Sequence, residues 1–175
     1  MNTPIPLTTN GVDTSFSTEF QFQITNAEGA TLHLKDLRGR ADVLQWLFWQ
    51  MGGLGPMSGQ AGHFAIYAPE KIQYGIDRYT KEVNRLYGVM NKRLADRPFL
   101  AGEYSIADMA SYPWVVPYER YSQDINDFPH LKRWFEAIKT RPAVAKVYAA
   151  VKPSYQKPMT DEEKKILFGQ TAKSV

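Results

Sequence analysis

Few residues in this chain of 175 residues could perform chemistry. The sequence contains no cysteine, so the chain itself offers no thiolate nucleophile, no thiolate metal ligand and no CxxC redox pair. None of the three histidines, His33, His63 and His130, has a partner at the spacing of a metal-binding motif. Ser105 and Asp108 have the Ser-x-x-acid spacing of a helix capping box, which makes Asp108 a capping acid rather than a catalytic base. The residues alone therefore predict no metal site and no sulfur chemistry of the chain's own.

The composition is that of a globular protein and narrows the class of partner. Hydrophobic residues make up 43% and charged residues 22% of the chain. The net charge of +3 gives no basic stripe, so a nucleic-acid partner is not expected. The N-terminus lacks the pattern of a signal peptide, and no apolar run reaches the roughly 18 residues of a membrane span. The sequence therefore predicts a cytoplasmic protein without a membrane segment.

Two kinds of hydrophobic periodicity divide the chain near residue 40. Phe16, Phe20, Phe22 and Ile24 alternate with polar residues, which predicts a strand, and 31–34 can form a returning strand after a turn at 26–29. We therefore expect a β-hairpin over about 19–35. An isolated two-stranded hairpin is marginally stable, so this hairpin must pack against another element.

Helical patterns follow from residue 41 onward. The first, from Asp42 to about Met51, is apolar nearly all round and is expected to be buried on most faces. The glycines and proline of 52–56 predict a kink or a break after it. A long second helix is expected to begin at Pro69. Its apolar stripe consists of Ile72, Ile76, Tyr79, Val83, Leu86, Met90 and Leu94.

Start signals predict four further helices. The capping box at Ser105 begins the third, Pro129 the fourth and Pro142 the fifth, and Thr160 caps a short final helix. The residues expected to face inward from the fourth and fifth helices are Leu131, Trp134, Phe135, Ile138, Val144, Val147 and Val151. The predicted organisation is a tail and hairpin over 1–40, a helical domain over 41–152 and a C-terminal tail over 153–175.

Several stretches of this helical block form a recognisable pattern. They are LQWLFWQMGGLGPM at 44–57, GHF at 62–64, the long helix over 78–94, LAGEYSIADMA at 100–110, PW at 113–114 and RPAV at 141–144. With these stretches, the block from 43 to about 151 resembles the helical C-terminal domain of glutathione transferases, specifically the bacterial nu class. The resemblance implies an all-α bundle of that type, here with a short N-terminal β-hairpin.

The resemblance also implies a chemistry and a set of site residues. The family performs glutathione-dependent thiol transfer or disulfide reduction, so glutathione as co-substrate would provide the missing sulfur, and no metal is needed. Arg85 matches an arginine that reaches a glutathione carboxylate across a homodimer interface. The alternative is a solvated arginine on the polar face of its helix.

A pocket for a small electrophile or a disulfide is the second site that the resemblance implies. Its candidate walls are soft or aromatic side chains, which suit varied apolar substrates. The candidates are Met57, His63, Phe64, Tyr112 and Trp114. The alternative is that they form ordinary helix-bundle core, and the residues favour this alternative for Tyr112 and Trp114.

Residues 1–40 depart from the family pattern. Family members carry an N-terminal thioredoxin-like domain that activates the glutathione thiol, and this segment contains no counterpart of its thiol-activating loop or of its acid–serine pair. The stretch 20–40 is instead similar to the opening hairpin of peroxiredoxins and thioredoxin-like reductases, without their reactive cysteine. We therefore expect impaired catalysis in this chain. The alternatives are a non-catalytic helical interaction module or a truncated or recombined transferase fragment.

Overall fold

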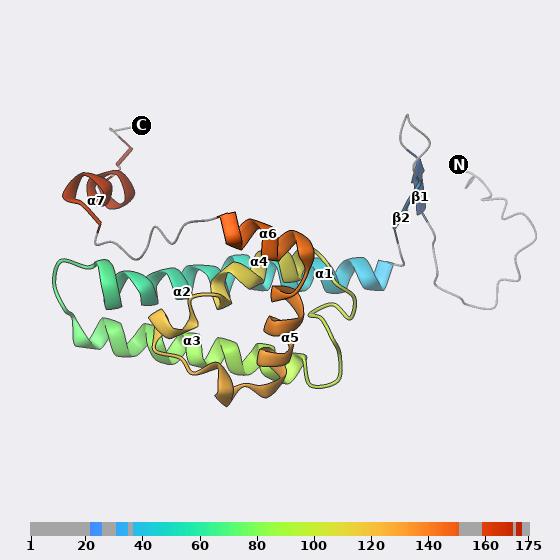
Figure 1. Cartoon of the computed structure of the whole chain (residues 1–175), viewed down its shortest axis with the longest axis horizontal. Coiled ribbons are helices and arrows are strands. Elements are labelled where there is room, and N and C mark those ends of the chain that lie inside the picture. Colours follow the sequence, from blue (N-terminus) through green and yellow to red (C-terminus); the bar gives the residue numbers. More distant parts are fainter. Residues whose placement is uncertain (1–21, 26–30, 35–36, 151–158, 170, 173–175) are drawn as a thin grey trace, which may run out of the picture.

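The computed structural model describes residues 22–25, 31–34, 37–150, 159–169 and 171–172. The chain is mainly helical, with two short strands before the first helix (Figure 1). The described helices are α1 (Leu37–Trp49), α2 (Gly55–Gly62), α3 (Gln73–Arg93), α4 (Ile106–Val115), α5 (Pro129–Lys139), α6 (Pro142–Ala150) and α7 (Asp161–Phe168). Within the described residues, no helix is long and apolar enough to cross a membrane.

The two strands form the predicted hairpin pairing. Strand β1 (Phe22–Thr25) pairs antiparallel with β2 (Thr31–Leu34), with Phe22 opposite Leu34 and Thr25 opposite Thr31. Phe16, Phe20 and the expected turn at 26–29 lie outside the described residues. The structure thus confirms a strand within each of the two predicted segments.

A single helical rod replaces the predicted break after the first helix. A π-helical turn, Gln50–Leu54, joins α1 to α2, and a second one, His63–Tyr67, follows α2. Across the junction Leu54 and Gly55 keep right-handed helical dihedrals, and the Gly55 amide donates to the Gln50 carbonyl five residues earlier. The prediction was a kink or a break: the helical geometry does become irregular at the glycine run, but the widened turn does not end the helix, so no break occurs.

The expectation that this first helix is buried on most faces was also wrong. Trp46, Gln50 and Leu54 are buried, but Phe48 and Met51 are 66% and 62% exposed. Among the described residues, α4 packs against α1, and α3 packs against α2 (Figure 1). The first helix is therefore apolar nearly all round in sequence and still exposes one side to solvent.

The long helix α3 begins at Gln73 rather than at Pro69. Ile72 has extended backbone dihedrals at the start of the helix and is 48% exposed, so it lies outside the buried stripe. Val83, Leu86 and Met90 are buried as predicted. Gly75 is also buried, because the Phe64 ring lies directly over it: a Cβ there would be 2.7 Å from Phe64 Cδ1.

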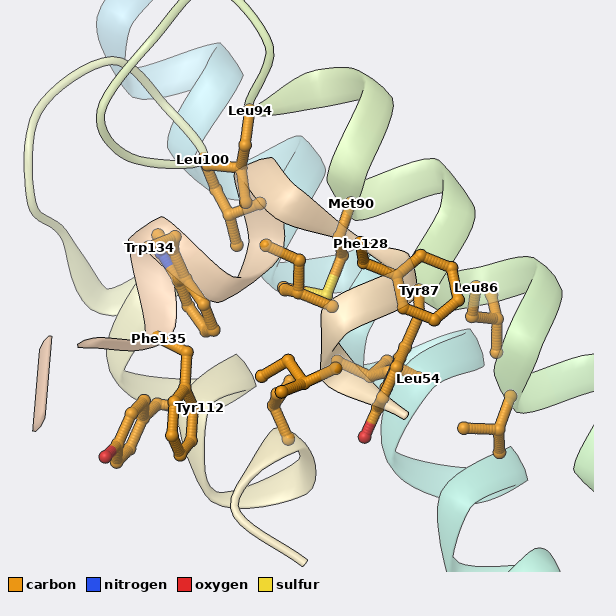
Figure 2. Packing of buried hydrophobic residues seen from close by; sticks show 14 of the residues in the cluster. Leu54, Leu86, Tyr87, Met90, Leu94, Leu100, Tyr112, Phe128, Trp134 and Phe135 are labelled. Carbon is orange, nitrogen blue, oxygen red and sulfur yellow. The ribbon is translucent and has the colours of Figure 1, made fainter. Parts of the chain in front are cut away.

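The core lies where the rod, α3, α4 and α5 meet (Figure 2). Leu131, Trp134, Phe135 and Ile138 of α5 face into it, as the sequence predicted. Helix α6 lies at the edge of the bundle: Val144 packs partly against the core, and Val147 is 57% exposed, so its predicted inward orientation was wrong. Val151 lies outside the described residues.

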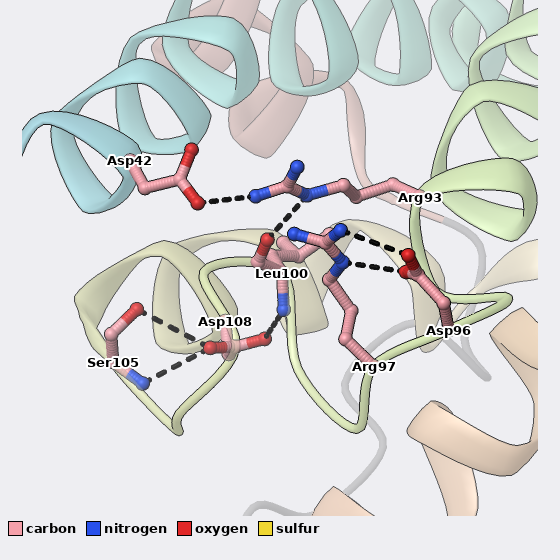
Figure 3. Close-up of polar contacts among 7 residues, drawn as sticks. All are labelled: Asp42, Arg93, Asp96, Arg97, Leu100, Ser105 and Asp108. Carbon is pink, nitrogen blue, oxygen red and sulfur yellow. Dashed lines mark hydrogen bonds and ion pairs between the residues drawn. The ribbon is translucent and has the colours of Figure 1, made fainter. Parts of the chain in front are cut away.

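The carboxylate of Asp108 is fully buried and joins three parts of the bundle (Figure 3). Its Oδ2 accepts the Ser105 amide at 3.0 Å and the Ser105 hydroxyl at 3.3 Å, which completes the predicted capping box at the start of α4. Its Oδ1 accepts the Leu100 amide at 3.0 Å and the Trp134 indole N–H at 2.8 Å. The same side chain thus caps α4 and fastens the preceding loop and α5.

A second polar contact fastens α1 to α3. Arg93, at the end of α3, pairs with Asp42 of α1, and its Nε donates to the Leu100 carbonyl at 2.7 Å (Figure 3). Its guanidinium also lies 5.1 Å from the centre of the Trp46 ring, in cation–π geometry. The loop at Leu100 is therefore tied through its amide to Asp108 and through its carbonyl to Arg93.

Replacing Asp108 should destabilise the whole bundle. Asp108→Ala leaves the Leu100 amide and the Trp134 indole without acceptors in a buried site, so we expect a loss of about 3 kcal/mol or more in unfolding free energy. Asp108→Asn keeps the size but turns an N–H toward one pair of donors, and it should lose about half as much. Urea unfolding followed by circular dichroism measures both. Asp77→Ala, an exposed aspartate on α3, is the control; an Asp108→Ala loss no larger than that of the control would contradict the role.

Two glycines of α3 should respond in opposite directions to alanine. Alanine normally stabilises a helix interior by about 1 kcal/mol relative to glycine, and we expect this gain for Gly88→Ala because no atom lies within 4 Å of the added Cβ. Gly75→Ala should instead destabilise by about 1–3 kcal/mol, because the Phe64 ring must move. Thermal unfolding of the two variants gives the comparison. Equal melting temperatures would show that Phe64 yields at no cost.

Candidate functional site

Arg85 lies on the solvent-facing side of α3, with its side chain 61% exposed. Its Nε and Nη2 donate to the two carboxylate oxygens of Glu82 at 2.9 and 2.7 Å. Arg78, one turn before Glu82, is 3.8 Å from the same carboxylate and is 55% exposed. The hydrogen bonds from Arg85 hold the pKa of Glu82 below its ordinary value.

This Arg78–Glu82–Arg85 cluster carries two guanidinium groups and one carboxylate. Glu82 occupies two of the five N–H donors of Arg85 in a fork arrangement. The other donors remain for a second carboxylate, and Arg78 holds Glu82 only loosely. Both alternatives for Arg85 fit this geometry. Its remaining donors leave room for a ligand carboxylate, and its pairing with Glu82 also fits a solvated arginine on the polar face of its helix.

The predicted pocket residues separate into two groups. His63 and Phe64 both belong to the second π-helical turn, with their rings edge to face at 5.5 Å. Phe64 stacks on Tyr79 of α3, with ring centres 5.3 Å apart. Met57, on α2, packs partly against the core. Of these three residues, Phe64 lies in the contact between the rod and α3.

Tyr112 and Trp114 lie on α4. Tyr112 is 5% exposed and stacks on Phe135 of α5 at 5.3 Å, so it belongs to the core (Figure 2). Burial raises the pKa of Tyr112 to about 12, which keeps its hydroxyl neutral at physiological pH. Trp114 is half-buried, and its indole lies against Gly55 and Gly59 of α2.

A hollow of about 170 Å³ lies between the rod and the segment that follows α4. Trp114 is the one predicted pocket residue among the described residues that line it. The lining residues are Ser58, Gly59, Gly62, Ile66, Tyr67, Trp114, Pro117, Arg120 and Tyr121.

Little in the sequence indicated this hollow. Gly59 and Gly62 are spaced three residues apart on α2, which leaves one side of that helix without side chains. That spacing is the signal that could have been used. Arg120 and Tyr67 could not have been paired in advance, since they are 53 residues apart; in the structure Arg120 Nη2 donates to the Tyr67 hydroxyl at 2.9 Å.

The last helix touches the rod near this hollow. The Phe168 ring lies 5.0 Å from that of His63 and 5.7 Å from that of Tyr67. Thr160 forms the predicted capping box with Glu163 at the start of α7. Among the described residues, no three histidine, aspartate or glutamate side chains are grouped so that they could hold a metal ion.

Curated relatives share the helical block. Disulfide-bond oxidoreductase YfcG of Escherichia coli (strain K12) is 54% identical over 109 residues, which cover 62% of this chain and 51% of the relative. Disulfide-bond oxidoreductase YghU of the same organism is 43% identical over 118 residues, covering 63% of this chain and 41% of the relative. The chain thus spans about half the length of the curated relatives it matches.

Solved structures agree with this match. A glutathione transferase, URE2P6, from Phanerochaete chrysosporium, solved with oxidized glutathione, superimposes with a TM-score of 0.60 and 34% identity, covering 63% of this chain and 53% of that one. A glutathione transferase from Burkholderia graminis, with two glutathione molecules bound per subunit, gives a TM-score of 0.61 and 34% identity, covering 74% and 65%.

The family model for the C-terminal domain of glutathione S-transferases matches residues 54–142. This range includes α2 to α5, the Asp108 network and the Arg78–Glu82–Arg85 cluster. The chain therefore belongs to the glutathione S-transferase family, through the helical C-terminal domain of that family.

Proposed function

We propose that this chain provides the helical half of a glutathione-dependent thiol transferase or disulfide reductase of the nu class. Glutathione is the co-substrate, and a small electrophile or a disulfide is the second substrate. The observation that carries the proposal is the 54% identity of its helical domain to a protein named as a disulfide-bond oxidoreductase. Glutathione bound in similar solved structures supports the choice of thiol.

In this proposal the helical domain, 41–152, binds but does not activate glutathione. The chain has no cysteine, so the sulfur comes from the co-substrate. A competent enzyme must also lower the pKa of that thiol or supply a base for it. The described residues offer exposed arginines that can hold a carboxylate, which fits binding. We therefore expect this chain by itself to be an impaired catalyst.

Arg85 is the proposed glutathione contact, reaching a carboxylate of the tripeptide across a homodimer interface. The proposal rests on the exposure of the Arg85 side chain and on its position in the Arg78–Glu82–Arg85 cluster. The proposed second-substrate pocket consists of Met57, His63, Phe64, Tyr112 and Trp114. Tyr112 belongs to the core, so it would support this pocket without contacting the substrate, and His63 and Phe64 would form its rim beside Tyr79.

Binding of glutathione should be measurable without catalysis. Isothermal titration with millimolar glutathione should show saturable binding, while glutathione-dependent reduction of 2-hydroxyethyl disulfide should stay close to the uncatalysed rate. Binding should weaken with added salt, because exposed charge pairs are screened. An absence of binding at millimolar glutathione would overturn the proposal.

Variants of the cluster test the role of Arg85. Arg85→Ala should weaken glutathione binding about three- to tenfold, the range of one exposed charged contact. Glu82→Gln should strengthen binding, because it releases both arginines from their present partner. Arg78→Ala measures the share of the neighbouring guanidinium, and Lys81→Ala, one more exposed cation on α3, is the control. Equal affinity in Arg85→Ala and Lys81→Ala would remove Arg85 from the site.

A non-catalytic interaction module is the second candidate, favoured by the exposed side of the rod. Phe48 and Met51 are large, apolar and more than half exposed, one turn apart. In this case the chain would self-associate or bind another protein through that side. Light scattering after gel filtration should then show an oligomer that Phe48→Ser dissociates and Val147→Ser, on α6, does not. A monomer with full glutathione binding would exclude this second candidate.

A further inference from the structure

Two pairs of exposed apolar residues lie on neighbouring helical elements. Phe48 and Met51 of the rod are 66% and 62% exposed, and Ile106 and Met109 of α4 are 50% and 52% exposed. Helix α4 packs against α1 and against the π-helical turn that contains Met51, so the two pairs belong to adjacent elements (Figure 1). These four residues are called the outer face below. Large apolar side chains grouped on a surface in this way mark a site that another element or molecule covers.

The start of α4 lies beside α1, which brings the two pairs of the outer face to the same part of the bundle. Asp108, in the first turn of α4, accepts the Leu100 amide. The Leu100 carbonyl in turn accepts a hydrogen bond from Arg93, which pairs with Asp42 of α1 (Figure 3). This chain of contacts fastens the first turn of α4, which carries Ile106 and Met109, next to α1.

The outer face lies on a part of the chain with almost no charge. Residues 43–54 contain no aspartate, glutamate, lysine or arginine. The one charged residue of α4 is Asp108, and it is buried. A surface without charge offers nothing to a nucleic acid or to an acidic peptide, whereas it suits a neutral apolar partner.

The β-hairpin carries an apolar face of matching character. In the register of β1 and β2, Phe22 is opposite Leu34 and Ile24 is opposite Leu32. Because residues two apart in a strand share a face, these four apolar positions lie on one face of the hairpin, and the polar residues of both strands lie on the other. A two-stranded hairpin alone is marginally stable, so this apolar face requires a partner.

The hairpin is joined to α1 within reach of the outer face. Residues 35 and 36, between Leu34 and Leu37, lie outside the described residues, so no angle between the hairpin and α1 is fixed by the described part of the chain. The three peptide units from Leu34 to Leu37 span at most about 10 Å. Phe48 lies about 17 Å beyond Leu37 along the helix axis. A hairpin that runs back along α1 brings Leu32, about 7 Å past Leu34, level with Phe48.

From these complementary surfaces we propose that the N-terminal hairpin packs its apolar face against the outer face of the rod and α4. Two strands about 4.8 Å apart fit over two helices whose axes are about 8–10 Å apart. The hairpin is then an internal cover that withholds this apolar surface from other proteins. The proposal does not depend on glutathione binding. It assigns to the hairpin the side of the rod that the second candidate function assigns to another protein.

Methionine methyl groups report directly on the outer face. The full chain is labelled with 13C at its methionine methyl groups, and a soluble nitroxide is added to relax the exposed ones. Met51 and Met109 should be protected almost as well as Met90, which is buried in the core. Ile24→Asp should remove this protection, whereas Gln23→Asp, on the opposite face of the same strand, should keep it. The protection should not change on dilution, because the cover belongs to the same chain.

Hydrogen exchange tests the hairpin side of the same contact. The amides that pair β1 with β2 should exchange at least about tenfold more slowly in the wild-type chain than in Met109→Asp, because an uncovered hairpin opens readily. Ile72→Asp is the control, since it adds the same charge at an exposed apolar position before α3 and should leave the exchange unchanged. Met109 and Ile72 are both about half exposed, so the helical bundle should keep its melting temperature in both variants.

Three results would overturn the proposal. In the first, the nitroxide relaxes Met51 and Met109 as fast in the wild-type chain as in Ile24→Asp. In the second, their protection is lost on dilution, which would identify a second copy of the chain as the cover. In the third, the hairpin amides exchange equally fast in Met109→Asp and Ile72→Asp.

Discussion

The buried carboxylate of Asp108 determines how the helices of this bundle meet. Its four hydrogen-bond partners come from the α4 cap, from the loop at Leu100 and from Trp134 of α5. A carboxylate is costly to bury unless its two oxygens accept hydrogen bonds. These bonds therefore favour the packing of α4, the loop and α5 that brings the donors together. The position of α4 then determines where its far end, with Trp114, lies against α2. A cap at one end of a helix thus positions a wall of the hollow at the other end.

The rod against which α4 packs depends on glycine in a different way. Gly55 of the rod allows the close approach of Trp114, and Gly75 of α3 allows that of Phe64 from the rod, whereas Gly59 and Gly62 line the hollow. Each contact gains packing where a larger residue would keep the elements apart. The π-helical turns on either side of α2 shift the helix face, so that buried and open glycines alternate along it. The same feature that costs helix propensity therefore makes both the tight packing and the hollow possible.

Local patterns predicted the elements of this fold well, and long-range contacts and exposure poorly. Both capping boxes, at Ser105 and Thr160, and the inward stripe of α5 follow from spacing within about one to three turns. The pairing of Arg93 with Asp42 joins residues 51 apart, and no periodicity encodes it. The prediction that the helix around Phe48 is buried on most faces failed for a related reason. An apolar helix surface favours packing against a partner, but the sequence pattern does not say whether the fold provides that partner. For the same reason the spacing of Gly59 and Gly62 did not predict a hollow, because its other walls come from residues far along the chain.

Anion binding and thiol activation require different arrangements of side chains. In the Arg78–Glu82–Arg85 cluster, the planar guanidinium group of Arg85 is held by Glu82 and still presents donors, an arrangement that suits carboxylates. Thiol activation needs something else: a donor or cation directed at the sulfur, or a base beside it. Tyr121, which lines the hollow, and Tyr87, in the core, are neutral near neutral pH, because burial raises the pKa of Tyr121 to about 12 and that of Tyr87 further still. In the proposed function, this helical domain therefore holds and orients an anionic ligand, and the reactive sulfur comes with glutathione.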